Sequence, residues 1–179
     1  VPRVYYANHN SHGDFALLWA CLPDDLRERT RPVAGADYWR KGRLRTYVAE
    51  RVIRAVLIDR DPTTRKEDPI AQMAAVVEHG DSLIVFPEGT RTTQVPINPF
   101  RPGVTVIARL AKAPIQTVFI DTDSPYLGRG WPLWRLPPLP IRFTVRLGRR
   151  FEPQPDAKAL LLEIEAYFAE EVHLPPTTR

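Results

Sequence analysis

Three clusters of polar residues carry side chains that could act on a substrate, and each follows a short apolar run of the sequence. They are 8–14 (NHNSHGD), 59–60 (DR) and 87–91 (PEGTR). In the first cluster, His9 and Asp14 stand five residues apart. A carboxylate can fix the tautomer of an imidazole and raise its basicity, and the intervening glycine permits the turn that would bring the two together. The first cluster is therefore a candidate general base with its orienting acid.

Two other interpretations of this cluster stay open on the sequence alone. His9 could be a surface histidine in a turn, with Asp14 serving only as the N-terminal cap of the helix that follows. His9, His12 and Asp14 are also acceptable metal ligands, but the remaining histidines, at 79 and 173, are far away in sequence.

The other two clusters are suited to binding an anion. A glycine such as Gly89 permits a turn that directs backbone N–H groups at an anion, and the guanidinium groups of Arg60 and Arg91 match phosphate. Both clusters have a plainer explanation as well. The glycine cluster could be a solvated turn with an ion pair, and Asp59 and Asp61 could simply neutralise the arginine between them.

Several common catalytic motifs are absent from the sequence. The chain contains no Gly-x-Ser-x-Gly, no Walker A loop and no Gly-x-Gly-x-x-Gly. These absences argue against a serine hydrolase of the nucleophile-elbow type and against nucleotide-driven phosphoryl transfer.

The elements that must position these clusters follow from the alternation of short apolar and amphipathic segments. This order predicts an α/β fold with a mostly parallel sheet covered by helices. We expect strands at 3–7, 31–34, 55–58, 82–86, 115–120 and 141–147, and helices at 15–21, 39–54, 67–79, 103–111 and 156–171. In such folds ligands bind beyond the carboxyl ends of the strands, and all three polar clusters directly follow an expected strand.

Length and composition set further bounds. The 179 residues, 44% hydrophobic and 26% charged, fit one globular domain. The longest uncharged apolar run near the start covers nine residues, 15–23, whereas a membrane-spanning helix needs about 20. The single cysteine, Cys21, excludes an internal disulfide and a cysteine-based zinc cluster. The chain begins at Val1 with no initiator methionine and no signal-peptide pattern, so we expect that it lacks a short N-terminal segment, with or without a membrane anchor.

Two segments could contact a membrane. Residues 31–54 carry seven basic and two acidic side chains, a net charge of +5. They could lie against an anionic membrane or an acidic carrier protein, or form a solvated helix face, whereas no motif favours nucleic acid. The proline-rich stretch 131–140 is expected to be a long irregular loop. Its Trp131 and Trp134 could enter a membrane interface or pack within a surface loop.

Four short motifs occur in a fixed order: Asn8-His9-x-Ser11-x-x-Asp14, Leu57-Ile58-Asp59-Arg60, Phe86-Pro87-Glu88-Gly89-Thr90-Arg91 and Ala113-Pro114-Ile115. Together they resemble the four boxes of the glycerolipid acyltransferase family, whose best-known members are the bacterial 1-acylglycerol-3-phosphate acyltransferases. The resemblance runs from about residue 4 to residue 120. Its first and third motifs are specific, and the other two are weak alone.

The resemblance implies that residues 1–179 form one acyltransferase domain that needs no metal or redox cofactor. His9 would take the proton from an acceptor hydroxyl, and Asp14 would orient its ring. The acceptor oxygen would attack the thioester of an acyl-CoA or acyl-carrier protein directly, with backbone amides near Gly89 stabilising the oxyanion. The residues implied to hold the glycerol phosphate are Arg60, Glu88, Gly89, Thr90, Arg91 and Arg101, with Asn8 and Ser11 in supporting positions.

The implied reaction moves a fatty acyl group to the free hydroxyl of a lysophospholipid, with 1-acylglycerol-3-phosphate as the expected acceptor and phosphatidate as the product. The implied location is peripheral, at the cytoplasmic face of a membrane.

Two departures from the family pattern matter. Gly35-Ala36-Asp37 stands where many members carry a lysine pair before an acidic residue, and Ala113 stands in place of valine. The first departure bears on the head group of the acceptor and not on the reaction type: Arg40 or Lys41 could substitute for the lysine pair, or the acceptor could be a lyso-aminolipid or lysophosphatidylethanolamine. Two alternatives stay open apart from this departure. They are acyl transfer to a non-lipid hydroxyl or amine, and a binding module for lipid or acyl carrier without turnover, although a module need not keep His9, Asp14, Glu88 and Arg91 together.

Overall fold

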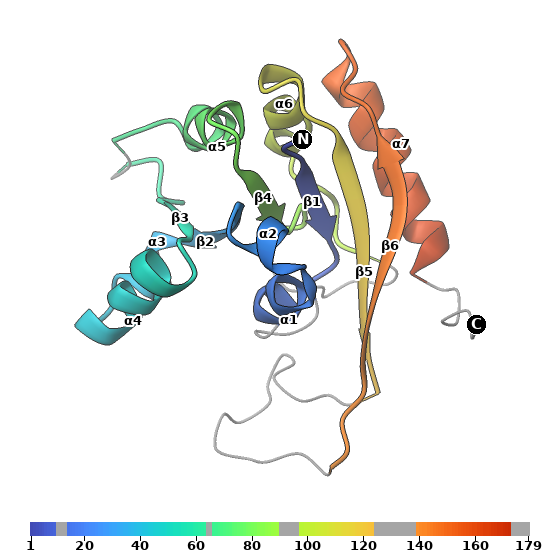
Figure 1. Cartoon of the computed structure of the whole chain (residues 1–179). Coiled ribbons are helices and arrows are strands. Elements are labelled where there is room, and N and C mark those ends of the chain that lie inside the picture. The colour runs from blue at the N-terminus through green and yellow to red at the C-terminus, as the bar shows by residue number, and fades with distance from the viewer. Residues whose placement is uncertain (10–13, 64–65, 90–96, 124–138, 173–179) are drawn as a thin grey trace.

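A computed structural model of the chain describes residues 1–9, 14–63, 66–89, 97–123 and 139–172. The described residues form a six-stranded sheet with the strand order β3-β2-β4-β1-β5-β6 (Figure 1). The first five strands in this order run parallel, and β6 pairs antiparallel with β5. The strands are β1 (Val4–Ala7), β2 (Thr30–Gly35), β3 (Val56–Ile58), β4 (Ser82–Val85), β5 (Ile115–Thr122) and β6 (Phe143–Phe151). The mostly parallel α/β fold is confirmed, with a strand in each of the six expected places.

The helices agree less closely with the sequence prediction. They are α1 (Asp14–Cys21), α2 (Asp24–Arg27), α3 (Ala36–Trp39), α4 (Arg43–Tyr47), the π-helical turn η1 (Val48–Val52), α5 (Pro69–Glu78), α6 (Gly103–Leu110) and α7 (Ala157–Glu171). The single helix expected over 39–54 is wrong. Gly42, with φ of 112°, interrupts it and separates α3 from α4. The four-residue α2 was not expected. Asp68 and Asp156 cap α5 and α7 by accepting backbone N–H groups.

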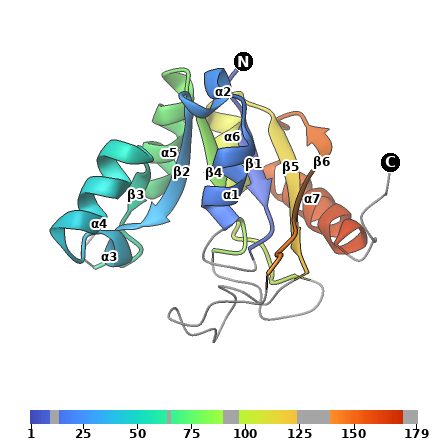
Figure 2. The ribbon, with the colours of Figure 1, turned by 60° about the horizontal axis from the view of Figure 1, so that its bottom comes forward.

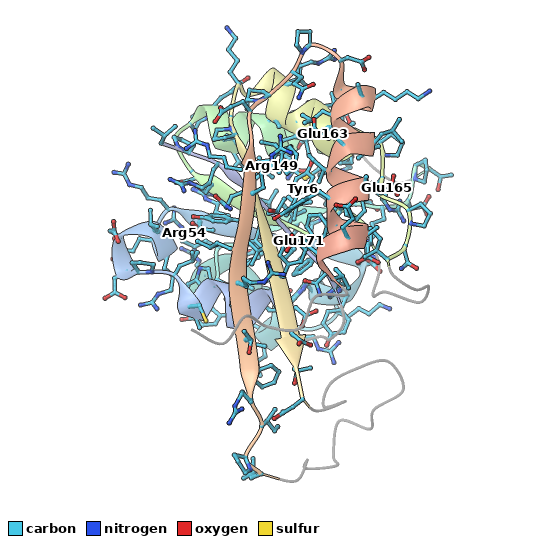
Figure 3. All side chains as sticks on the ribbon, turned by 90° about the vertical axis from the view of Figure 1, so that its right-hand side faces the viewer. Tyr6, Arg54, Arg149, Glu163, Glu165 and Glu171 are labelled. Atoms are coloured by element: carbon cyan, nitrogen blue, oxygen red, sulfur yellow. The ribbon has the colours of Figure 1, made fainter. Side chains whose placement is uncertain are left out.

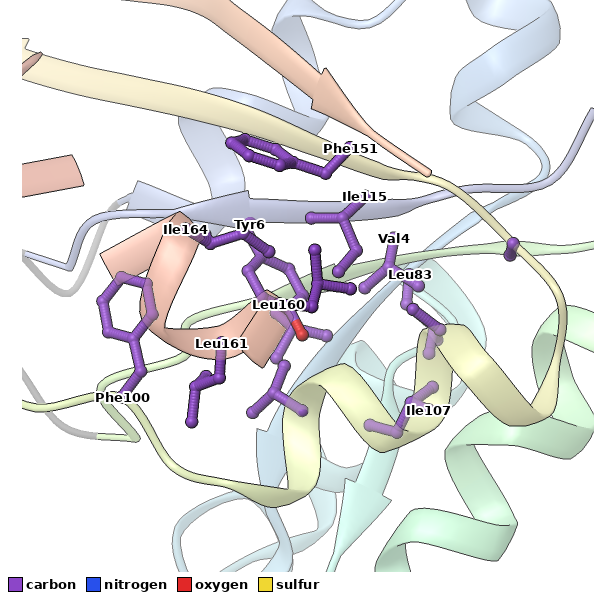
Figure 4. Close-up of a cluster of buried hydrophobic side chains, with 14 of the residues drawn as sticks. Val4, Tyr6, Leu83, Phe100, Ile107, Ile115, Phe151, Leu160, Leu161 and Ile164 are labelled. Carbon is purple, nitrogen blue, oxygen red and sulfur yellow. The ribbon is translucent and has the colours of Figure 1, made fainter. Parts of the chain in front are cut away.

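Helices cover both faces of the sheet (Figure 2). Along β1, Val4 and Tyr6 belong to the core that contains side chains of α5, α6 and α7, whereas Tyr5 and Ala7 belong to the core under α1. Because both faces of this strand are buried, it appears in the sequence as a continuous apolar run and not as an alternating one. In the larger core, α7 contributes an apolar face on which Leu160 and Ile164 (Figure 4) and also Phe168 are buried.

The long C-terminal helix is attached to the edge strand by ion pairs. Arg149 of β6 pairs with Glu163 (Figure 3), at a distance of 3.0 Å, and Arg146 lies 2.7 Å from Glu171. A further hydrogen bond runs from the backbone N–H of Phe100 to Oε1 of Glu165, at 2.9 Å. Helix α7 therefore contacts both the sheet and the loop that precedes α6.

The parallel topology brings three loops to one edge of the sheet. The chain leaves β1 at Asn8, β3 at Asp59 and β4 at Phe86, and these strands run in the same direction. The loops that follow them contain the polar clusters of the sequence. No helix among the described residues is long and apolar enough to cross a membrane.

Candidate active site

His9 and Asp14 meet across the loop between β1 and α1. Nδ1 of His9 lies 3.2 Å from Oδ2 of Asp14. The aspartate is in the first turn of α1 and its side chain is 3% exposed, whereas the imidazole is 20% exposed. Since a carboxylate can only accept, Nδ1 is the donor and Nε2 is the nitrogen that can take up a proton. The geometry suits a general base whose conjugate acid is stabilised by a buried carboxylate.

The imidazole ring is further held by an aromatic neighbour. The rings of His9 and Phe86 stack with their centroids 4.3 Å apart and an interplanar angle of 27°. Phe86 directly follows β4, so the neighbouring parallel strands β1 and β4 place these two rings side by side. The sequence shows Phe86 as the first residue of a motif but does not reveal this contact.

The backbone around His9 is fixed by two buried polar side chains. The side-chain amide of Asn8 donates to the carbonyl of Ile120 at 2.8 Å and accepts from the N–H of the same residue at 2.7 Å. This pair of bonds continues the β1–β5 pairing beyond the end of β1. Oε1 of Glu88 accepts from the N–H of His9 at 3.4 Å, and Oε2 accepts from the N–H of Asn98 at 2.9 Å. Both Asn8 and Glu88 therefore support the position of His9.

A cleft of about 490 Å³ opens beside His9. Three of its polar lining residues, His9, Arg60 and Gly89, come from the loops after β1, β3 and β4. The lining also includes Arg101, Asp37 and a set of apolar side chains: Phe15, Pro32, Val33, Trp39, Ile53, Ile58, Met73, Val85, Phe86 and Val104. The cleft thus offers a candidate base, two cations and apolar surface together, which suits an amphiphilic ligand with an anionic group.

Each of the two arginines lies over a glycine. A Cβ on Gly35 would overlap the guanidinium of Arg60, and a Cβ on Gly89 would lie 2.7 Å from Cδ and 2.9 Å from Cζ of Arg101. Gly89 also has a φ of 69°, which favours glycine. Because Gly35 and Gly89 have no side chain, Arg60 and Arg101 can pass over them to reach the cleft.

Arg60 has an ion-pair partner that the sequence analysis did not identify. Its Nε lies 3.5 Å from Oδ1 of Asp37, in α3. Asp61, one of the neighbours expected to neutralise Arg60, instead accepts hydrogen bonds from the backbone and hydroxyl of Thr63, and these lower the pKa of Asp61. Asp37 is therefore a carboxylate beside a cation on the surface of the cleft.

Other expected site residues fall outside the described part of the chain. These are Ser11, Thr90 and Arg91 of the motifs, His12 of the alternative metal set, and Trp131 and Trp134. The N–H of Gly89 already donates to the carbonyl of Phe86 at 2.9 Å, so an oxyanion near this glycine would have to use other amides. Within the described ranges, no three His, Cys, Asp or Glu side chains lie close enough together to hold a metal ion.

Comparisons with known proteins identify a family and a similar fold. The profile of a family described as Acyltransferase matches residues 1–121. No curated protein matches the chain. The crystal structure of the 1-acyl-sn-glycerophosphate (LPA) acyltransferase PlsC from Thermotoga maritima has a similar fold, with a TM-score of 0.69 and 18% sequence identity. That similarity covers 96% of this chain but 65% of the PlsC chain.

Proposed function

Since the chain belongs to the acyltransferase family, we propose that it transfers a fatty acyl group from acyl-CoA or acyl-carrier protein to the free hydroxyl of a lysophospholipid. The proposed acceptor is 1-acylglycerol-3-phosphate, and the product is phosphatidate. One observation carries this proposal: the His9–Asp14 pair borders a cleft that also contains two arginines and apolar side chains.

The proposed reaction is a direct acyl transfer. Nε2 of His9 removes the proton from the acceptor hydroxyl as its oxygen attacks the thioester carbonyl, and Asp14 stabilises the imidazolium that forms. The tetrahedral intermediate then breaks the carbon–sulfur bond, and the imidazolium returns the proton to the leaving thiolate. The steps balance with an ester and a free thiol as products, and they use no metal or redox cofactor.

The acceptor would bind through its charge and its chain. Arg60 and Arg101 are exposed at the cleft and can make charge-assisted hydrogen bonds to the phosphate. In the family resemblance Glu88 is assigned to the same role, but both of its carboxylate oxygens accept backbone N–H groups here, so we propose that it acts through His9 and Asn98. Thr90 and Arg91 remain proposed contacts of the head group, and Ser11 a supporting residue.

Asp37 supports a second candidate acceptor. Its carboxylate lies on the cleft beside Arg60 and could pair with the ammonium group of a lyso-aminolipid or of lysophosphatidylethanolamine. A zwitterionic head group would then place its anion on Arg60 or Arg101. The two candidates differ only in the head group and share the same transfer chemistry.

The proposed location is peripheral, on the cytoplasmic face of a membrane. Acyl-CoA and acyl-carrier protein are cytoplasmic donors, whereas a lysolipid acceptor partitions into the bilayer. The enzyme would therefore work where the two substrates meet.

The proposal is tested by following a labelled acyl group from each donor to lysophosphatidate, lysophosphatidylethanolamine and lyso-ornithine lipid. His9→Ala removes the base and should lower kcat by about 10²–10⁴-fold. His79→Ala is the matched control, because this exposed histidine bonds the carbonyl of Ala75 at the end of α5 and does not line the cleft. Transfer that survives in His9→Ala, or a folded wild type without transfer to any acceptor, would contradict the proposal.

A further inference from the structure

The segment that forms α3, α4 and η1 exposes large apolar side chains to solvent. Tyr38 is 46% exposed, Leu44 76%, Tyr47 61% and Val52 51%. A soluble protein rarely gathers such side chains on one short segment unless another surface covers them. We call the exposed residues of this segment, 38–54, the α3–η1 surface.

The exposed apolar side chains point away from the protein interior. Ala49 and Ile53 of the same segment are buried. Leu44 and Tyr47 of α4 and Val52 of η1 are instead mostly exposed, so they lie on the side of the segment that faces solvent. Figure 1 shows α3 and α4 at the edge of the molecule, beside β2 and β3 and away from α6 and α7. The helix therefore has one apolar face for the protein and a second one that the described residues leave uncovered.

The same segment also exposes an excess of positive charge. The segment exposes six basic side chains, Arg40, Lys41, Arg43, Arg45, Arg51 and Arg54, against the two acidic side chains of Asp37 and Glu50. The guanidinium of Arg45 lies over the ring of Tyr38, 4.7 Å from its centroid. Aromatic and aliphatic groups interleaved with arginines are the pattern of helices that lie in the interface of an anionic bilayer.

We propose that the α3–η1 surface docks the protein on a bilayer that contains anionic lipids. Leu44, Tyr47 and Val52 would enter the interfacial region, and the surrounding basic side chains would bind lipid phosphates. This inference rests on the proposed function, because a lysolipid acceptor has to be drawn from such a bilayer. It adds which face of the molecule meets the lipid.

The position of the cleft supports this orientation. Tyr38, Trp39 and Ile53 of the same segment line the cleft that contains His9. Docking through the α3–η1 surface therefore brings the cleft next to the lipid, so an acceptor could move from the bilayer to the base without crossing bulk water. An acidic carrier protein would match the charge as well, but a bilayer also accounts for the apolar face that is turned to solvent.

The test is co-sedimentation of the full chain with phosphatidylcholine vesicles that either contain or lack phosphatidylglycerol. Arg43→Glu/Arg51→Glu reverses two charges of the surface, and Leu44→Gln/Tyr47→Gln removes apolar contacts. Two control variants make the same kinds of change at exposed positions away from this surface. The charge control is Lys112→Glu/Lys158→Glu, and the apolar control is Leu110→Gln/Leu162→Gln. Leu110 ends α6, Lys112 follows it, and Lys158 and Leu162 belong to α7. We expect the wild type and both controls to bind phosphatidylglycerol vesicles, and each surface variant to bind at least about tenfold more weakly.

Thermal unfolding and acyl transfer are measured on the same variants. All variants should keep the unfolding midpoint of the wild type within a few degrees, because every changed side chain is exposed. Transfer to a short-chain, water-soluble lysolipid should be unchanged in the surface variants. The docking proposal is overturned if the wild type does not bind the anionic vesicles, or if the surface variants bind these vesicles as well as the controls do. It is also overturned if the surface variants lose affinity for acyl-carrier protein but not for the vesicles. Absent transfer together with the expected vesicle binding would instead contradict the proposed function.

Discussion

Replacing Gly35 by alanine should weaken acceptor binding with almost no loss of stability. Gly35 has an ordinary φ of −73°, so alanine fits the backbone. The new Cβ would overlap the guanidinium of Arg60 and Oδ1 of Asp37, which are the ends of exposed, flexible side chains and can move away. The free energy of unfolding should therefore change by less than about 1 kcal/mol. The cost should appear in the cleft, because Arg60 can no longer lie where it does now.

The magnitude follows from the interaction that is lost. A hydrogen bond to a charged group contributes about 1.5–3 kcal/mol, and the exposed position of Arg60 favours the lower end. We therefore expect the KM for the acceptor to rise about tenfold in Gly35→Ala, with kcat nearly unchanged.

Alanine substitutions at two further glycines serve as controls. They distinguish the effect of displacing an arginine from the effect of backbone strain. Gly80 has a φ of 100° and open space where a Cβ would lie, so Gly80→Ala should cost about 1–2 kcal/mol of stability without affecting transfer. Gly89 combines a φ of 69° with the close approach of Arg101, so Gly89→Ala should lose stability and also raise the acceptor KM. Urea unfolding and steady-state transfer kinetics on the three variants supply both readouts. The reasoning fails if Gly35→Ala leaves the KM unchanged, or destabilises the fold as much as Gly80→Ala does.

Two other side chains give separate predictions. In Glu88→Gln one carboxylate oxygen becomes an NH₂, which cannot accept a hydrogen bond from the N–H of His9 or Asn98. We therefore expect kcat to fall about tenfold while the acceptor KM stays within about twofold. A rise in KM alone would mean that Glu88 binds the head group. Burial raises the pKa of Tyr6 well above its ordinary value, and its hydroxyl has no hydrogen-bond partner within the described residues. Tyr6→Phe should therefore add about 1 kcal/mol of stability near neutral pH. Above about pH 10 Tyr6 loses its proton in the unfolded chain but keeps it in the folded protein. The free energy of unfolding of the wild type should therefore fall by up to about 1.4 kcal/mol more per pH unit than that of the variant. Urea unfolding of both proteins near neutral pH and above about pH 10 checks this. If their free energies of unfolding fell equally with pH, the Tyr6 hydroxyl would not be buried as described.

The strands could be predicted because their signal is local. Runs such as 83–86 are apolar throughout, since both faces of the parallel sheet are covered. The same topology rule placed His9, Arg60 and Gly89 at one edge of the sheet, and all three line one cleft. These inferences required only the order and type of the elements.

Two features of the site could not be predicted because they depend on contacts between different loops and helices. The ion pair of Arg60 with Asp37 joins the loop after β3 to α3. The carboxylate of Glu88 meets two backbone N–H groups, and a backbone group carries no sequence signal. The helix expected over 39–54 failed for a local reason, because the amphipathic pattern continues across Gly42 although the backbone turns there.

The hydrogen bond between Glu165 and the N–H of Phe100 has a consequence for how such enzymes can diverge. Phe100 precedes Arg101, one of the two cations of the cleft, whereas Glu165 lies well beyond residue 121, where the family match ends. A substitution in α7 can thus shift the loop of Arg101 while every motif stays intact. Under the proposed function, a change of head-group preference therefore has a route through a helix outside the matched residues 1–121.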